Sequence, residues 1–214
     1  MFKKLAQIKM LLNYKNSEPL GDFAILKSEL LGAKVSPQVA AKLKAVEGYH
    51  PPINLDKLSQ YPPGSFGREY ADHMQANHLQ PFNVSPELED VAKSNVFALR
   101  YAVTHDIFHV LLGFDTSYAG EIGVLAFAVE QNYSKLLKIG LWIAKLLYPI
   151  LAPQQIQAIF TNMNKGRYLG ENAEFLLGYQ FEEHWTESIA EIRKCLSIPP
   201  IESLQNCTIT AICS

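Results

Sequence analysis

An apolar periodicity in residues 94–112 constrains the fold of this chain more than any other feature of its sequence. Apolar side chains recur there at steps of three and four, as in a helix that is buried along one face: Val96, Phe97, Leu99, Val103, Ile107, Val110 and Leu111. Gly113 is expected to end this helix. Residues 115–117 then offer polar side chains that can cap a second helix over 118–131. The sequence therefore predicts a hairpin of two helices.

Proline and glycine mark further boundaries along the chain. Ser36-Pro37 and Ser85-Pro86 are typical of helix starts, because serine caps a helix and proline fits its first position. Pro153 is expected to open a later helix, whereas several prolines and glycines make 48–66 a loop-rich stretch. Residues 172–196 are predicted to form one long helix, since apolar side chains recur there at helical spacing: Phe175, Leu176, Tyr179, Trp185, Ile189 and Ile192.

Length and composition favour an all-α protein with one core. The chain has 214 residues, of which 48% are hydrophobic and 19% charged, so it can bury a large interior and is not intrinsically disordered. Strand-like alternation is confined to 208–212 and is weak there. We expect a single compact multi-helix domain over 1–214, with a basic helix at 1–18 and a C-terminal tail at 201–214.

Charge, cysteine content and hydropathy argue against several classes of protein and indicate where this one is located. The net charge of −2 gives no indication of a nucleic-acid surface. The three cysteines lie near the C-terminus without a C-x-x-C pair, which argues against a disulfide framework or a thiolate metal cluster. No apolar stretch reaches the roughly 20 residues of a transmembrane helix. No secretory or mitochondrial leader is recognised either, so we expect a cytoplasmic, bacterial protein.

Four polar residues of the predicted hairpin form a candidate metal site. His105, Asp106 and His109 fall within an arc of about 100° on the first helix, with the two histidines one turn apart. Glu121 lies on the second helix, which can return its carboxylate over the same face. Two imidazoles and two carboxylates suit a divalent cation and leave positions open for water or substrate. The alternative is an ordinary hydrogen-bonded histidine pair. The pattern is not the H-E-x-x-H of zinc proteases, because Asp106 follows the first histidine.

These residues resemble the signature of the coenzyme Q (ubiquinone) biosynthesis protein 4 family, which is H-D-x-x-H followed by eleven residues and a glutamate. The chain has His105-Asp106-Ile107-Phe108-His109, then residues 110–120, then Glu121. Residues 63–70 are similar to the last eight positions of the family's P-x-G-S-x-G-x-x-Y segment, and residues 104–113 to its T-H-D-x-x-H-V-L-x-G. The resemblance extends over roughly residues 20–200 and includes a C-terminal block: Trp185, Glu191-Ile192-Arg193 and Ile198-Pro199.

The resemblance implies an all-helical protein that handles prenylated ring intermediates of ubiquinone or another prenylquinone. It assigns His105, Asp106, His109 and Glu121 as metal ligands and catalytic residues, and it favours zinc, with iron, manganese or magnesium as alternatives. The implied activity is oxidative decarboxylation of a prenylated hydroxybenzoate-type acid. The rival is a non-catalytic lipid-binding scaffold that organises other quinone-biosynthesis enzymes at the membrane. Eukaryotic members carry a mitochondrial presequence that is not recognised here.

A prenylated substrate requires access to a bilayer, and one predicted helix offers it. Lys135, Lys138 and Lys145 fall within about 80° of one another on a helix whose remaining positions are mostly apolar. Such a helix can lie in a membrane interface, or it can pack in the core or against a second subunit. We expect peripheral contact with the inner face of the membrane. A homodimer is also consistent with the many apolar helical residues.

Three further residues are candidates for substrate binding. Arg68 and Tyr70 follow a Gly-Ser-x-Gly loop that can bring a guanidinium to a phosphate or carboxylate head group, although Arg68 could also be an ordinary surface cation. Arg100 precedes His105 by five residues and could support the ligands or face solvent. His73, His78 and His184 have no ligand companions in the sequence and are expected to be structural: they form no metal-binding pattern.

Overall fold

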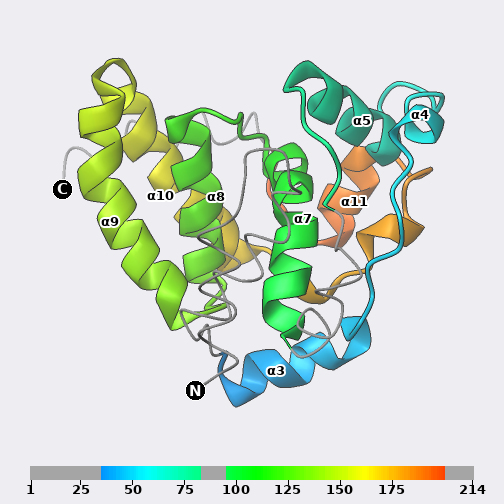
Figure 1. Cartoon of the computed structure of the whole chain (residues 1–214), viewed down its shortest axis with the longest axis horizontal. Coiled ribbons are helices and arrows are strands. Elements are labelled where there is room, and N and C mark those ends of the chain that lie inside the picture. Colours follow the sequence, from blue (N-terminus) through cyan, green and yellow to red (C-terminus); the bar gives the residue numbers. More distant parts are fainter. Residues whose placement is uncertain (1–34, 83–94, 201–214) are drawn as a thin grey trace, which may run out of the picture.

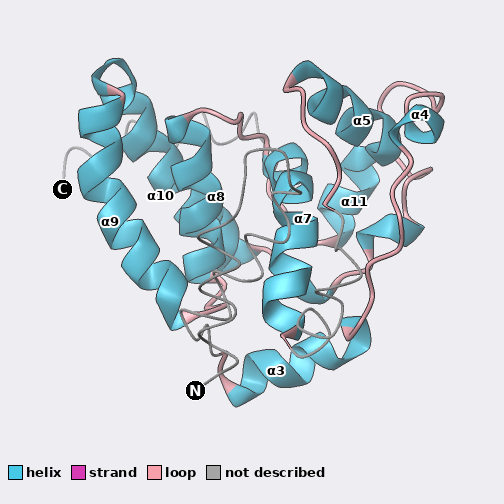
Figure 2. Ribbon diagram, in the orientation of Figure 1, coloured by secondary structure: helices cyan, strands magenta, loops and turns pink. Residues whose placement is uncertain are grey.

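The computed structural model describes residues 35–82 and 95–200, and within them the regular structure is helical apart from one isolated bridge between Ser65 and Ser188 (Figures 1 and 2). The all-α prediction is therefore confirmed. The α-helices are α3 (Pro37–Leu43), α4 (Leu55–Leu58), α5 (Phe66–Ala76), α7 (Val96–Leu112), α8 (Tyr118–Glu130), α9 (Lys135–Leu151), α10 (Ile156–Asn172) and α11 (Ile189–Cys195). The predicted basic helix at 1–18, the helix start at Ser85-Pro86 and the tail at 201–214 lie outside the described residues. A single domain over the whole chain stays a prediction.

The predicted hairpin is confirmed as α7 and α8. The Asn95 side chain accepts a hydrogen bond from the Ala98 N–H and begins α7. Gly113 ends that helix in the left-handed conformation, with a φ of 70°, which costs glycine little because it has no Cβ. The Ser117 hydroxyl then accepts a hydrogen bond from the Gly120 N–H and begins α8. The two helices run in opposite directions at the centre of the molecule (Figure 1).

Helices α9 and α10 cover the side of α8 that faces away from α7 (Figure 1). Pro153 opens a short 3-10 turn, Pro153–Gln155, that leads directly into α10, as predicted. The backbones of α8 and α10 approach closely through glycines. A Cβ added to Gly166 would lie 2.1 Å from the Gly123 carbonyl oxygen, and one added to Gly170 would lie 2.9 Å from the Phe127 oxygen. The position of α8, and with it of Glu121, therefore depends on these small residues.

We expect the substitution Gly166→Ala to lower the free energy of unfolding by about 1–3 kcal/mol, because the added methyl group forces α10 away from α8. Chemical denaturation measures this change. The matched control is Gly140→Ala in the interior of α9, where an added Cβ meets nothing within 4 Å. That variant should be more stable than the parent by about 0.5–1 kcal/mol, the ordinary gain of alanine over glycine in a helix. Equal stability of the two variants would contradict the close approach of α8 and α10.

The other side of α7 is covered by α3 and α5, and by short turns from the C-terminal part of the chain (Figure 1). Ser36 caps α3 ahead of Pro37, as predicted. Ser65 caps α5, whose Phe66 ring stacks on Trp185 with 4.7 Å between ring centroids. Phe66, Phe108 and Phe181 are completely buried in one large core, to which α5, α7 and α8 all contribute side chains.

The prediction of one helix over 172–196 is wrong. Helix α10 ends at Asn172, and two 3-10 turns, Leu176–Gly178 and Phe181–Glu183, precede α11. The backbone there hydrogen-bonds with other elements: the N–H groups of Phe66 and Gly67 donate to the carbonyls of Glu187 and Trp185 at 2.7 and 2.8 Å. These tertiary contacts replace the bonds of a continuous helix. Of the apolar residues on which the prediction rested, Leu176 and Ile192 are buried. Four more are partly buried against the core, from separate short turns and loops: Phe175, Tyr179, Trp185 and Ile189.

Candidate metal centre

Helices α7 and α8 bring together three of the four predicted ligands. One ligand atom each from His105, His109 and Glu121 lies within 4.8 Å of the other two. The two Glu121 oxygens face different imidazoles: Oε1 is 3.3 Å from His109 Nε2, and Oε2 is 3.6 Å from His105 Nε2. This convergence follows from the one-turn spacing of the histidines on α7 and from the place of Glu121 in the first turn of α8. The arrangement could hold a divalent cation.

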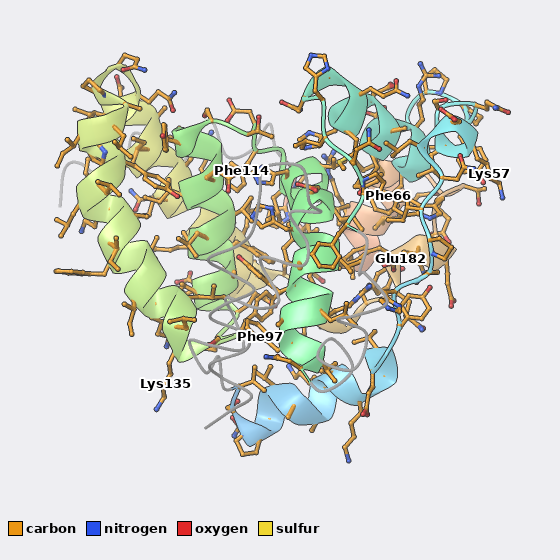
Figure 3. All side chains as sticks on the ribbon, in the orientation of Figure 1. Lys57, Phe66, Phe97, Phe114, Lys135 and Glu182 are labelled. Atoms are coloured by element: carbon orange, nitrogen blue, oxygen red, sulfur yellow. The ribbon has the colours of Figure 1, made fainter. Side chains whose placement is uncertain are left out.

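The neutral ring of His109 presents a lone pair to Glu121. Its Nδ1 lies 3.3 Å from the Phe114 carbonyl, which can only accept, so in the neutral imidazole Nδ1 carries the proton and Nε2 carries the lone pair. Figure 3 labels Phe114 in the connection between the two helices. His109 Nε2 is buried and, despite its 3.3 Å distance from Glu121, has no partner with hydrogen-bond geometry among the described residues. A metal ligand needs a lone pair held in this way by a hydrogen bond on the opposite nitrogen.

The electrostatics of the site favour a positive species between His109 and Glu121. Burial alone would lower the pKa of His109, but its contact with the Glu121 carboxylate and the charge of that group outweigh burial and leave the pKa above its ordinary value. The Phe114 carbonyl and Asp106 act in the same direction. Either a proton or a metal cation can supply this positive charge, and the two compete for His109 Nε2.

Asp106 stands beside this group and is not one of its three converging members. Its Oδ1 lies 3.6 Å from His105 Nδ1, on the far side of the imidazole from Glu121. A carboxylate in that place can orient the histidine and keep Nε2 turned toward the site. The role of Asp106 as a direct ligand stays a prediction.

The centre lies at the boundary between core and solvent. The His109 side chain is completely buried, whereas the side chains of His105, Asp106 and Glu121 are about a third exposed, at 31%, 26% and 35%. One ligand is therefore fixed by the core, and the others face an open side where a polar group of a substrate could approach. The Tyr101 ring contacts the His105 ring edge-on, with 6.0 Å between the ring centroids, and places an aromatic group beside this ligand.

His73 of α5 is a member of this neighbourhood that sequence reasoning missed. Its ring stacks on that of His109, with 5.9 Å between centroids, and its Nε2 is buried without a hydrogen-bond partner in the part of the chain that the structure describes. Burial is the main reason that its pKa is lowered, and the positive charge that His109 can carry adds to this effect. No local signal could have identified His73, because α5 and α7 meet only through tertiary packing.

The two arginines that were predicted to bind substrate form contacts with residues outside the candidate metal centre. The Arg68 Nε donates to Asp72 at 2.8 Å, and its Nη1 donates to the Ser59 carbonyl at 2.9 Å. Arg100 is completely buried, where it donates to Glu182 at 2.6 and 3.0 Å. Substrate binding by these residues stays a prediction.

Tyr70 is influenced electrostatically by Asp106, which stands beside the centre. Its side chain is 1% exposed and its ring lies 5.2 Å from that of Trp185. Burial raises the pKa of its hydroxyl, and the negative charge of Asp106 raises it further. Tyr70 is therefore placed in the core on the Asp106 side of the centre, and its part in substrate binding is also untested.

Comparisons with known proteins agree with the signature of the site. Residues 42–202 match the family model described as coenzyme Q (ubiquinone) biosynthesis protein Coq4. The ubiquinone biosynthesis protein COQ4 homologue of Xenopus tropicalis is 29% identical over 157 residues, which are 69% of this chain and 52% of that protein. The homologue of Rattus norvegicus is 30% identical over 152 residues, 69% of this chain and 56% of that protein. The chain thus spans about half the length of the curated relatives that it matches.

The fold also has a solved counterpart. A crystal structure from Nostoc punctiforme, provisionally described as a ubiquinone biosynthesis protein, matches with a TM-score of 0.65 and 24% identity, over 92% of this chain and 96% of that one. At this identity the likeness establishes the fold. The family match covers most of the chain and includes both helices of the hairpin that carries the H-D-x-x-H signature and Glu121, so the chain belongs to the Coq4 family of coenzyme Q (ubiquinone) biosynthesis proteins.

Proposed function

We propose that the protein holds a divalent metal ion at His105, His109 and Glu121 and there binds the polar ring of a prenylated hydroxybenzoate-type intermediate. The observation that carries this proposal is the convergence of three ligand atoms within 4.8 Å, one of them a buried nitrogen without a hydrogen bond. Membership of a ubiquinone biosynthesis family supports a quinone precursor as the substrate class, and the partial exposure of His105 and Glu121 is consistent with the approach of its ring.

The donor set fits a transition metal. Two imidazole nitrogens and one carboxylate oxygen suit zinc, iron or manganese, whereas magnesium prefers oxygen donors. Bound there, a divalent cation supplies a Lewis acid that can polarise the carboxylate or phenolate oxygen and compensate charge on the ring during loss of carbon dioxide. The residues themselves fix the geometry: Phe114 holds the tautomer of His109, and Asp106 orients His105.

Metal binding should stabilise the fold, because the ligands lie on two helices that the ion would join. Addition of Zn²⁺ at about 100 times its dissociation constant is expected to raise the free energy of unfolding by about 2.7 kcal/mol. Thermal unfolding with and without the ion measures this shift. The variant Glu121→Gln should lose most of the shift while keeping the stability of the metal-free protein, since the Glu121 side chain is 35% exposed. An equal shift in both proteins would place the bound metal elsewhere.

Turnover distinguishes the enzyme from its rival. We expect purified protein, reconstituted with zinc, iron or manganese in parallel, to release carbon dioxide from a prenylated hydroxybenzoate, with a proton replacing the carboxylate on the ring. Hydroxylation of the same carbon should require iron or manganese, dioxygen and two electrons from an added reductant, because zinc cannot change its valence. His105→Ala should abolish this release. The rival is a lipid-binding scaffold in which the same ligands join α7 and α8, and the observation in its favour is the apolar surface that α9 exposes. Retention of metal and prenyl lipid without turnover under any of these conditions would support the scaffold.

A further inference from the structure

Charge is segregated along the chain in a way that the metal centre does not explain. Between Glu130 and Glu171 there is no acidic residue, although the net charge of the whole protein is −2. That interval comprises α9 and nearly all of α10 and contains five cations: Lys135, Lys138, Lys145, Lys165 and Arg167. The helix pair on the left of Figure 1 is therefore a locally basic part of an acidic protein.

Helix α9 also leaves most of its apolar side chains exposed. It packs on α8 through a narrow face, because only Leu141 and Ala144 of its residues are buried. Trp142 is 66% exposed and Ile150 is 75% exposed. The exposed side chains recur at steps of three and four and form one stripe, here called the apolar face: Ile139, Trp142, Ile143, Leu146, Leu147 and Ile150. A contiguous exposed stripe of this kind marks an interaction surface.

A basic pocket opens at the edge of the apolar face. It has a volume of about 340 Å³ and lies where α9 meets the end of α8 and α10. Its lining includes three cations, one acid, one amide and the tryptophan of the apolar face: Lys138, Lys145, Arg167, Glu130, Asn132 and Trp142. Lys138 donates to Asn132 at 2.8 Å. Lys145 and Arg167 have no ion-pair partner among residues 35–82 and 95–200. Three converging cations against one carboxylate favour an anion such as a phosphate group.

We propose that the apolar face docks on the surface of a bilayer that contains anionic phospholipid, and that the pocket takes the phosphate of one such lipid. Trp142 belongs to both the face and the pocket, so an acyl region and its headgroup would be contacted side by side. Tryptophan and lysine beside aliphatic side chains are the composition of a helix that lies in the interface. A second copy of the chain is a poorer occupant, because two-fold pairing would bring together two segments that both lack acids.

The geometry of the helices agrees with docking. No single helix within the described ranges has the length and apolar character to cross a bilayer, although α9 and the Pro153–Asn172 segment meet both conditions as a pair, bent by 113°. A helix that lies along the interface needs only one apolar side, and α9 has its apolar face on the side away from α8. This surface is formed by other residues than the metal ligands, so the two proposals can be tested separately.

The test is co-sedimentation with vesicles of phosphatidylcholine, with and without phosphatidylglycerol. The parent protein should bind the mixed vesicles much more strongly than vesicles of phosphatidylcholine alone. The double variant Lys145→Glu/Arg167→Glu should weaken that binding at least about 25-fold, since each of the two cations contributes about 5-fold near an anionic surface. Trp142→Ser/Ile143→Ser should reduce binding to the same vesicles. The control is Lys57→Glu, which removes an exposed lysine at the opposite side of the molecule (Figure 3) and should bind as the parent does.

Two results would overturn the proposal. The first is equal binding of the parent, the pocket variant and the control to mixed vesicles. The second is a parent dimer in sedimentation analysis that Trp142→Ser/Ile143→Ser dissociates while neither protein binds vesicles, which would make the face a subunit interface. A circular dichroism spectrum and a midpoint of thermal unfolding equal to those of the parent confirm that each variant is folded, and this control does not depend on metal binding. Inorganic phosphate at millimolar concentration should compete only weakly, since it cannot occupy the apolar face.

Discussion

Replacement of His109 with alanine should lower the affinity of the protein for a divalent ion by about 100-fold or more, since substitution of even a residue that only orients a ligand costs about 10–100-fold. The His109 side chain is completely buried, and its Nδ1–H contacts the Phe114 carbonyl, so its Nε2 is the most rigidly held donor of the centre. Competition with a chromophoric chelator measures the affinity.

Loss of the buried His109 ring could also disturb the core, so a second variant separates binding from folding. Asp106→Asn retains the size of a partly exposed side chain and should reduce affinity by a smaller factor, about 10-fold, because it orients His105 without joining the converging group. His184→Ala is the control: this histidine pairs with Glu187 and does not contact the site, so its loss should leave affinity unchanged. Parent-like affinity in His109→Ala would refute the assignment of His109 as a ligand.

Replacement of Arg100 with methionine should lower the free energy of unfolding by about 3–5 kcal/mol, because it leaves a buried carboxylate without its counter-ion. The Arg100 and Glu182 side chains are 0% and 2% exposed and approach to 2.6 Å. The guanidinium also donates to the Tyr179 carbonyl. Urea denaturation, followed by circular dichroism, measures the loss.

The double variant Arg100→Met/Glu182→Met isolates the cause. With neither charge in the core, most of the lost stability should return, since apolar side chains of similar size often replace a buried ion pair without loss. An exposed pair supplies the comparison: Arg68→Met breaks the contact with Asp72, whose side chain is 49% exposed, and should cost at most about 1 kcal/mol. A double variant as unstable as Arg100→Met alone would show that the charge of Glu182 is not the cause.

Local signals predicted the hairpin because its limits are set by neighbouring residues. Gly113 is needed where the backbone turns left-handed, and Ser117 caps the helix that follows it. The histidines of the site are neighbours for the same reason, since one helical turn separates them. Spacing alone did not identify Glu121 as a ligand. Its prediction also depended on the hairpin and on the resemblance to a family signature.

The parts of the fold that sequence reasoning missed depend on contacts between distant segments. Residues 172–196 have helical spacing, but their backbone bonds to the start of α5, and the Tyr179 carbonyl bonds to Arg100. His73 contacts the candidate metal centre only through the packing of α5 on α7. For α9 the sequence left interfacial and buried arrangements open. The structure leaves its apolar stripe exposed, because only one narrow side meets α8.

Anomalous X-ray diffraction from crystals grown with Zn²⁺ tests the central claim most directly. We predict one strong peak between α7 and α8, within about 2.0–2.2 Å of the ligand atoms of His105, His109 and Glu121, the bond lengths of zinc to nitrogen and oxygen. No peak there at saturating zinc, or a peak bound by other residues, would contradict the account.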